Sequence, residues 1–95
     1  MNKIEICRKT FDLESGHTVT LIYSITIDEW EYPISGIIHE YYGVSVMISE
    51  HAEDACIQCV TLSERKAYSL IDVLAENYVT PISLYDVVHD WLAAQ

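Results

Sequence analysis

Alternating apolar and polar side chains identify Thr18–Asp28 as the strand around which the chain is organised. The apolar side chains recur at every second position: Val19, Leu21, Tyr23, Ile25 and Ile27. Threonine and serine fill most of the positions between them, so one face of an extended strand is apolar and the other carries hydroxyl groups. β-branched residues are frequent in the stretch. The pattern predicts a half-buried antiparallel strand whose apolar face needs a cover.

Three or four further strands are predicted, all within residues 3–61. Lys3–Leu13 forms a hairpin with the central strand, and a shift in its alternation predicts a bulge near Arg8–Thr10. Strand character returns at Ile34–Glu40, and clear alternation resumes over residues 42–49. The short apolar run Ala55–Thr61 predicts an edge strand.

Beyond residue 62 the apolar spacing changes to that of a helix, which predicts helices over about residues 64–77 and 83–94. Their apolar stripes are expected to cover the apolar face of the central strand. The expected contacts join Leu70, Leu74, Val88 and Trp91 on the helices to Leu21, Tyr23 and Ile25 on the strand.

Helix start signals support both helices. Thr61 is the candidate N-cap of the first, with Ser63 as the alternative, and Ser83 is the candidate N-cap of the second. Ile82 and Val87 stand where the two members of a hydrophobic staple would lie.

These elements predict an α+β fold in a single domain, residues 1–95. An antiparallel sheet of four to five strands carries the two C-terminal helices packed on one face. The threonine and serine face of the central strand is then left toward solvent or toward a second copy of the chain. A homodimer through this open sheet face is one expected form of partnership.

The net charge of the chain limits the classes of partner that it is expected to bind. Fifteen acidic residues face five basic ones, giving a net charge of −10, and no lysine or arginine occurs from Thr10 to Glu64 or after Lys66. Such a surface repels phosphate backbones and anionic lipid, so direct nucleic-acid or membrane binding is not expected. A protein with a basic surface is the partner class that this charge favours. No apolar run has the length of a membrane span or of a signal-peptide core, which predicts a cytoplasmic protein with reduced cysteines.

Aromatic and acidic groupings supply the candidate contact residues. Aromatic residues gather around the predicted turn after the central strand, at Trp30, Tyr32, Tyr41 and Tyr42. Acidic residues repeat at helical spacing on both predicted helices. The candidate partner-binding residues are Trp30, Tyr32, Asp72, Glu76, Asp86 and Asp90. The alternative interpretations are sheet aromatics that pack internally and a solvated acidic helix face.

A second hypothesis is a small zinc-binding or redox protein that uses His51, Cys56 and Cys59. Two thiolates and an imidazole suit tetrahedral zinc. However, residues three apart in a strand point to opposite faces, so Cys56 and Cys59 would not share one ion. The competing interpretation is cysteines that act as small apolar residues, and no cofactor is predicted.

The second half of the chain resembles a family of small proteins from Clostridia and related Firmicutes that is catalogued as a domain of unknown function. The residues that carry the resemblance are Tyr42, Gly43, Val79, Thr80, Pro81, Leu84, Asp86, Val87, Asp90 and Leu92. The chain departs from that pattern in its cysteines and in the apolar run Ala55–Thr61. The resemblance implies a small cytosolic bacterial protein and carries no activity or functional residues with it.

The leading functional hypothesis is therefore a small acidic cytosolic protein that binds a basic-surfaced partner as a protein-interaction or regulatory module. No serine–histidine–aspartate order, phosphate-binding glycine loop or paired-carboxylate motif is recognisable. A catalytic role consequently has no positive support from the sequence.

Overall fold

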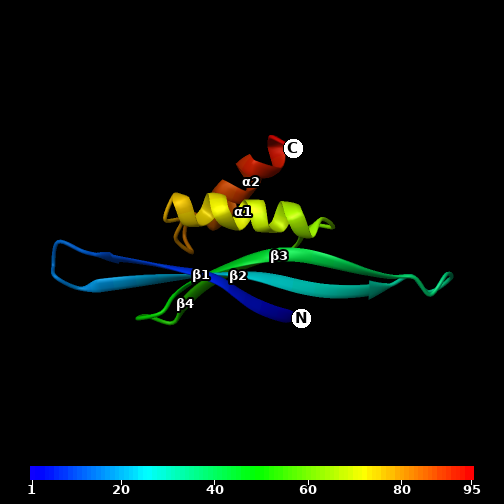
Figure 1. The fold of residues 1–95 in the computed structure, drawn as a ribbon, viewed down its shortest axis with the longest axis horizontal. Coiled ribbons are helices and arrows are strands. Elements are labelled where there is room, and N and C mark those ends of the chain that lie inside the picture. The colour runs from blue at the N-terminus through cyan, green and yellow to red at the C-terminus, as the bar shows by residue number, and fades with distance from the viewer.

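The computed structural model of residues 1–95 is a four-stranded antiparallel sheet followed by two helices. The elements are β1 (Asn2–Asp12), β2 (Thr18–Glu31), β3 (Ile38–Ile48), β4 (Glu53–Thr61), α1 (Glu64–Glu76) and α2 (Leu84–Ala93). The strands lie in the order β1-β2-β3-β4, and both helices lie on the same side of the sheet (Figure 1). The predicted α+β fold is confirmed, with four strands rather than five. Neither helix has the length and apolar character needed to cross a bilayer.

β2 lies inside the sheet between β1 and β3, as its alternation requires. Tyr23 stands opposite Val46, and Ile25 stands opposite Val44, so apolar side chains from both strands point to the same face. On the other side β1 pairs with β2, and the bulge falls between Glu5 and Cys7 rather than at the predicted Arg8–Thr10. The extra residue lets Ile6 and Cys7 both reach the core.

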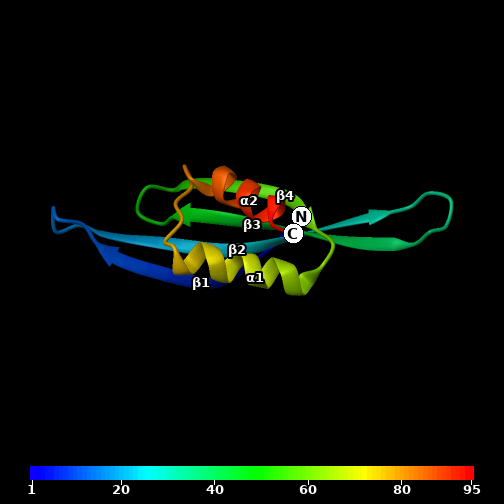
Figure 2. The ribbon, with the colours of Figure 1, turned by 90° about the horizontal axis from the view of Figure 1, so that it is seen from above.

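The helices form the cover that the apolar face of β2 needs. Seen from above, α1 and α2 lie side by side over the sheet, and α1 runs roughly along the strands (Figure 2). Leu70, Leu74 and Val88 are buried in one cluster with Leu21, Tyr23 and Ile25, and Trp91 packs against it. The predicted contacts are therefore confirmed. The cluster comprises Val19, Leu21, Tyr23, Ile25, Tyr42, Val44, Val46, Ala67, Leu70, Ile71, Leu74, Ala75, Val79, Leu84 and Val88.

The two ends of α1 are capped by different interactions. Ser63, the alternative candidate, is the N-cap, and its hydroxyl accepts a hydrogen bond from the Lys66 amide. At the other end Tyr78 takes the left-handed conformation (φ 49°), and the Val79 amide donates back to the Leu74 carbonyl. This is a Schellman-type stop, and it turns the chain before the proline that follows.

A buried hydrogen bond joins the sheet to the turn between the helices. The Tyr23 hydroxyl donates to the Val79 carbonyl at 2.9 Å. Burial raises the pKa of this phenol, so the group stays protonated and keeps its donor. The bond satisfies a buried backbone carbonyl of the turn between the helices.

The α2 start differs from its prediction. Ser83 stands at the N-cap position, but its side chain bonds to Thr80 and caps no helix amide. Ile82 is 84% exposed, so it forms no hydrophobic staple with Val87. The Thr80–Ser83 turn uses these groups to satisfy its own backbone instead.

The hydroxyl-bearing face of β2 is not left toward solvent as predicted. Ser24, Thr26 and Ser45 are buried although both helices lie on the opposite face. The sheet coils, so that the amide of Gln58 on β4 reaches the sulfur of Met1 beside β1 at 2.8 Å. The outer strands thus curl behind the inner ones, a consequence of strand twist that residue alternation does not record.

Gly43 of β3 lies where this coiling is tightest. A Cβ at this position would overlap the Ile57 carbonyl oxygen and stand 2.5 Å from the Thr26 hydroxyl. Only glycine allows β4 to approach this closely.

Replacing Tyr23 by phenylalanine tests the link between the sheet and the helix turn. Tyr23→Phe leaves the Val79 carbonyl buried and unpaired, which should cost about 1–3 kcal/mol of unfolding free energy. Urea denaturation of both proteins measures the difference. An unchanged midpoint would show that the bond contributes nothing.

Replacing Thr26 by valine should change the free energy of unfolding in the opposite direction. The Thr26 hydroxyl oxygen is fully buried and has no hydrogen-bond partner, so its desolvation is uncompensated. Thr26→Val substitutes a methyl group of similar shape and should raise the unfolding free energy by about 1 kcal/mol. Thr10→Val, at an exposed position of the same face on β1, is the matched control and should change little. A less stable Thr26→Val protein would contradict this account.

Candidate functional site

The hairpin between β2 and β3 continues past the helices and forms a projecting arm, defined here as residues 29–38. Figure 1 shows this end of the sheet extending beyond both helices. Every residue of the arm is exposed. Pro33 and Gly36 lie in its turn, where Gly36 takes φ 70° and donates its amide to the Tyr32 carbonyl. The arm is the part of the chain where sequence-predicted contact residues are exposed without a cover.

One face of the arm and of its base is aromatic. Trp30 stacks on Tyr32 with ring centroids 5.7 Å apart, and Tyr41 lies tilted 6.3 Å from Trp30. His39 meets the Tyr32 ring edge-on at 5.0 Å. A hydrogen bond to Tyr32 raises the pKa of the Tyr41 phenol. These contacts hold the rings in place while Trp30 stays 56% exposed and Tyr32 43% exposed. Tyr42, predicted to join them, is instead buried in the core on the other face.

The other face of the arm and its base is acidic. Glu29 stands directly opposite Glu40 across the two strands, and Glu31 follows on the same side. Like charges in directly opposed positions destabilise a strand pair. Only Glu5 and Asp28 form ion pairs in the whole chain, with Arg8 and with the Met1 amine, so no cation of this protein offsets the arm carboxylates. The sequence analysis missed these glutamates because the pairing register decides that they face each other.

Three isoleucines extend the apolar surface of the arm. Ile34, Ile37 and Ile38 are all exposed, and Ile34 is completely so. The sequence signal was present in the run Ile34–Ile38, which carries apolar residues across a proline- and glycine-containing turn. Periodicity reasoning assigned these side chains to a strand and overlooked that nothing in the chain is available to cover them.

The acidic residues of the helices are exposed but separate from the arm residues in the sequence and in the fold. Asp72 and Glu76 lie on α1, and Asp86 and Asp90 lie on α2. None of the four forms an ion pair. They add to the negative field of the surface rather than to the arm itself.

The residues of the zinc hypothesis are not gathered into a site. No three histidine, cysteine, aspartate or glutamate side chains anywhere in the chain lie close enough to hold an ion. Burial raises the pKa of the Cys56 thiol, whereas Cys59 is exposed at a left-handed position (φ 57°) of the β4 bulge. Cys56 and Cys59 therefore differ in burial and in backbone conformation, and no histidine or carboxylate joins them in a cluster.

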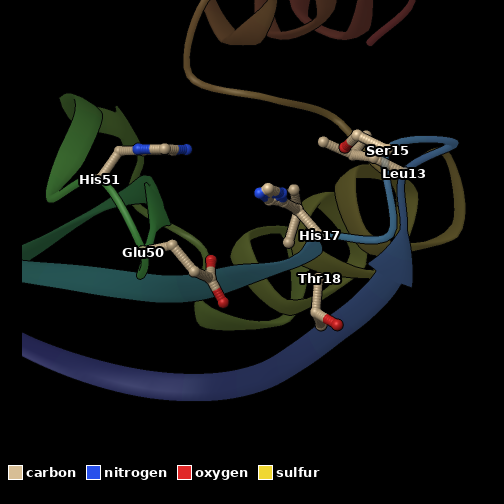
Figure 3. Close-up of a pocket in the computed structure, with 7 residues that line it drawn as sticks. Leu13, Ser15, His17, Thr18, Glu50 and His51 are labelled. Atoms are coloured by element: carbon tan, nitrogen blue, oxygen red, sulfur yellow. The ribbon is translucent and has the colours of Figure 1, made fainter.

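His51 lies instead at a cavity of about 430 Å³ between two turns of the sheet. Figure 3 shows His17 and His51 on opposite sides of it, with Glu50 between them. The lining residues are Leu13, Ser15, His17, Thr18, Val19, Glu50 and His51. The Glu50 carboxylate accepts a hydrogen bond from the Thr20 amide at 2.8 Å and so joins the β3–β4 turn to β2. No sequence pattern indicates that His17 and His51 line one cavity, since they belong to different hairpins.

Comparison with known protein families gives one match. The model of a family described as being of unknown function covers residues 2–94. No curated protein and no solved structure matches the chain. The site must therefore be interpreted from its own geometry.

The Glu50 contact makes stability depend on pH with a definite sign. The Thr20 amide lowers the pKa of Glu50 below its ordinary value of 4.5. The contact therefore adds stability above that value and loses it as the pH falls through the lowered pKa. Urea denaturation at a series of pH values should show wild type losing its advantage over Glu50→Gln on acidification. A constant difference at all pH values would contradict this, and repetition at high salt controls for distant charges.

Proposed function

The chain belongs to DUF6514, a family of unknown function, and from its own surface we propose that it is a protein-interaction module that binds a partner with a basic surface. The single observation that carries the proposal is the lack of internal partners for its acids. Fifteen acidic residues form only two ion pairs within the chain.

Uncompensated charge of one sign supports binding in two ways. It steers an oppositely charged protein toward the surface, and it disfavours wrong partners of like charge. The exposed acids of α1, α2 and the arm supply this field, and the aromatic face of the arm supplies side chains of the kind that anchor interfaces. A regulatory or inhibitory role on that partner is the form of activity that such a module would have.

The proposal also includes the kind of cell and the compartment in which the protein is found. We infer a cytoplasmic bacterial protein, of the Clostridia and related Firmicutes, from the residues around Val79–Leu92 and from the absence of a long apolar run in the sequence. A homodimer through the sheet face opposite the helices is a separate proposal. The zinc or redox alternative has no supporting geometry and is not proposed.

Affinity capture at two salt concentrations tests the proposal. Immobilised protein should retain a basic protein from lysate of the source cells at low salt and release it at high salt, because the Debye length falls to about 3 Å at about 1 M salt. A variant with Asp72, Glu76, Asp86 and Asp90 changed to their amides should retain less of it.

Two outcomes would contradict the proposal. Either no protein is retained at low salt, or the retained protein is unaffected by salt and by removal of the acids. The amide variant must give wild-type urea denaturation, which shows that its fold is intact.

A further inference from the structure

We propose that the arm is the docking element, and that it inserts into an apolar recess flanked by arginine or lysine side chains on a protein partner. This inference rests on the proposed function and adds the site and the shape of the partner. It takes the arm as residues 29–38 with the aromatic and acidic faces described above.

The arm exposes several large apolar and aromatic side chains within a short stretch. Trp30, Tyr32, Ile34, Ile37 and Ile38 are all large, all exposed and all within one hairpin. Trp30 and Tyr32 lie on the aromatic face and Ile38 on the acidic face, opposite Glu31. Exposed large apolar side chains gathered in this way mark an interaction site. Because the arm projects from the body (Figure 1), a matching surface has to be concave.

The aromatic contacts lower the cost of binding. Trp30 and Tyr32 are already stacked, and Tyr32 is also held edge-on by His39. Rings that are fixed before binding lose little conformational entropy on burial. Tryptophan and tyrosine are also the residues that most often carry binding energy at the centre of an interface.

Because one face of the arm is acidic, the rim of the partner's recess is expected to carry positive charge. Glu29 and Glu40 oppose each other directly, and Glu31 adjoins them without a cation nearby. A guanidinium or ammonium group placed between Glu29 and Glu40 would relieve their repulsion. A cation over the exposed Trp30 ring would gain further attraction to its π-face.

A second copy of the chain does not meet these requirements. It would bring its own arm carboxylates and a further net charge of −10. It also contains no lysine or arginine between Thr10 and Glu64, the stretch that includes the whole arm. The arm therefore fits a different protein.

Site-specific photocrosslinking tests this inference. A photoreactive phenylalanine analogue replaces Tyr32 on the arm or, as matched control, Tyr85, an exposed tyrosine of α2. After illumination in lysate of the source cells, position 32 should give one predominant adduct with a basic protein, and position 85 should not. Trp30→Ala should reduce adduct formation about 30-fold at limiting concentration, as loss of a binding hot spot does. The combined change Glu29→Gln, Glu31→Gln and Glu40→Gln should reduce it and remove its salt dependence.

Several results would overturn the inference. An adduct at twice the mass of the chain would identify a second copy as the occupant. Equal adducts from positions 32 and 85, or no adduct from position 32, would place the docking surface elsewhere or nowhere. An adduct unaffected by the three glutamine changes would remove the cationic rim. If salt-dependent capture persists while position 32 gives no adduct, the proposed function stands and the arm is not its site. Wild-type urea denaturation of each variant confirms that the fold is retained.

Discussion

The structure depends on burial of one face of β2 beneath the two helices. Leu21, Tyr23 and Ile25 are almost completely removed from solvent there. Full burial of such side chains contributes about 1.5–3 kcal/mol each. Helices as short as α1 and α2 are marginal in isolation, since packing supplies most of their stability. The sheet face and the helices therefore stabilise each other, and the hydrogen bond from Tyr23 to Val79 fixes where they meet.

The same arrangement explains why the arm projects beyond the helices. α1 has 13 residues and is about 20 Å long, whereas β2 has 14 residues and spans about 46 Å. One helix cannot cover a strand of nearly equal residue count, so both ends of the sheet extend past the helices in Figure 1. At the β1–β2 end Phe11 still meets the Tyr78 ring edge-on at 5.8 Å. At the β2–β3 end no such contact exists, and the apolar residues of the arm stay exposed.

Residue periodicity predicted the elements that bury one face and expose the other. It located β2, both helices and the contacts between them, because burial on one side leaves an alternating or helical pattern in the sequence. Periodicity did not predict the features that depend on how the sheet coils and how its strands are paired. Ser24 and Thr26 are polar and yet buried, because the sheet coils around them. The opposition of Glu29 and Glu40 depends on strand register, and the cavity that His17 and His51 both line depends on turn position.

The candidate site was predictable only in its chemistry. Trp30 and Tyr32 were singled out as aromatic residues near a turn, and the structure shows them exposed. The importance of Ile34 and Ile37 follows from the length of the helices, which leaves them outside the cover. Cys56 and Cys59 attracted attention by spacing alone, and strand geometry separates them.

Amide hydrogen exchange along β2 tests the central claim most directly, because one strand passes through both environments. If the helices cover its centre and leave the arm bare, the amides of the Leu21–Ile25 segment should exchange only through global unfolding. Those of the arm should exchange through local opening at much lower free energy. Equal protection along the whole strand in the isolated protein would contradict the account, since it would mean that the arm is packed as firmly as the core.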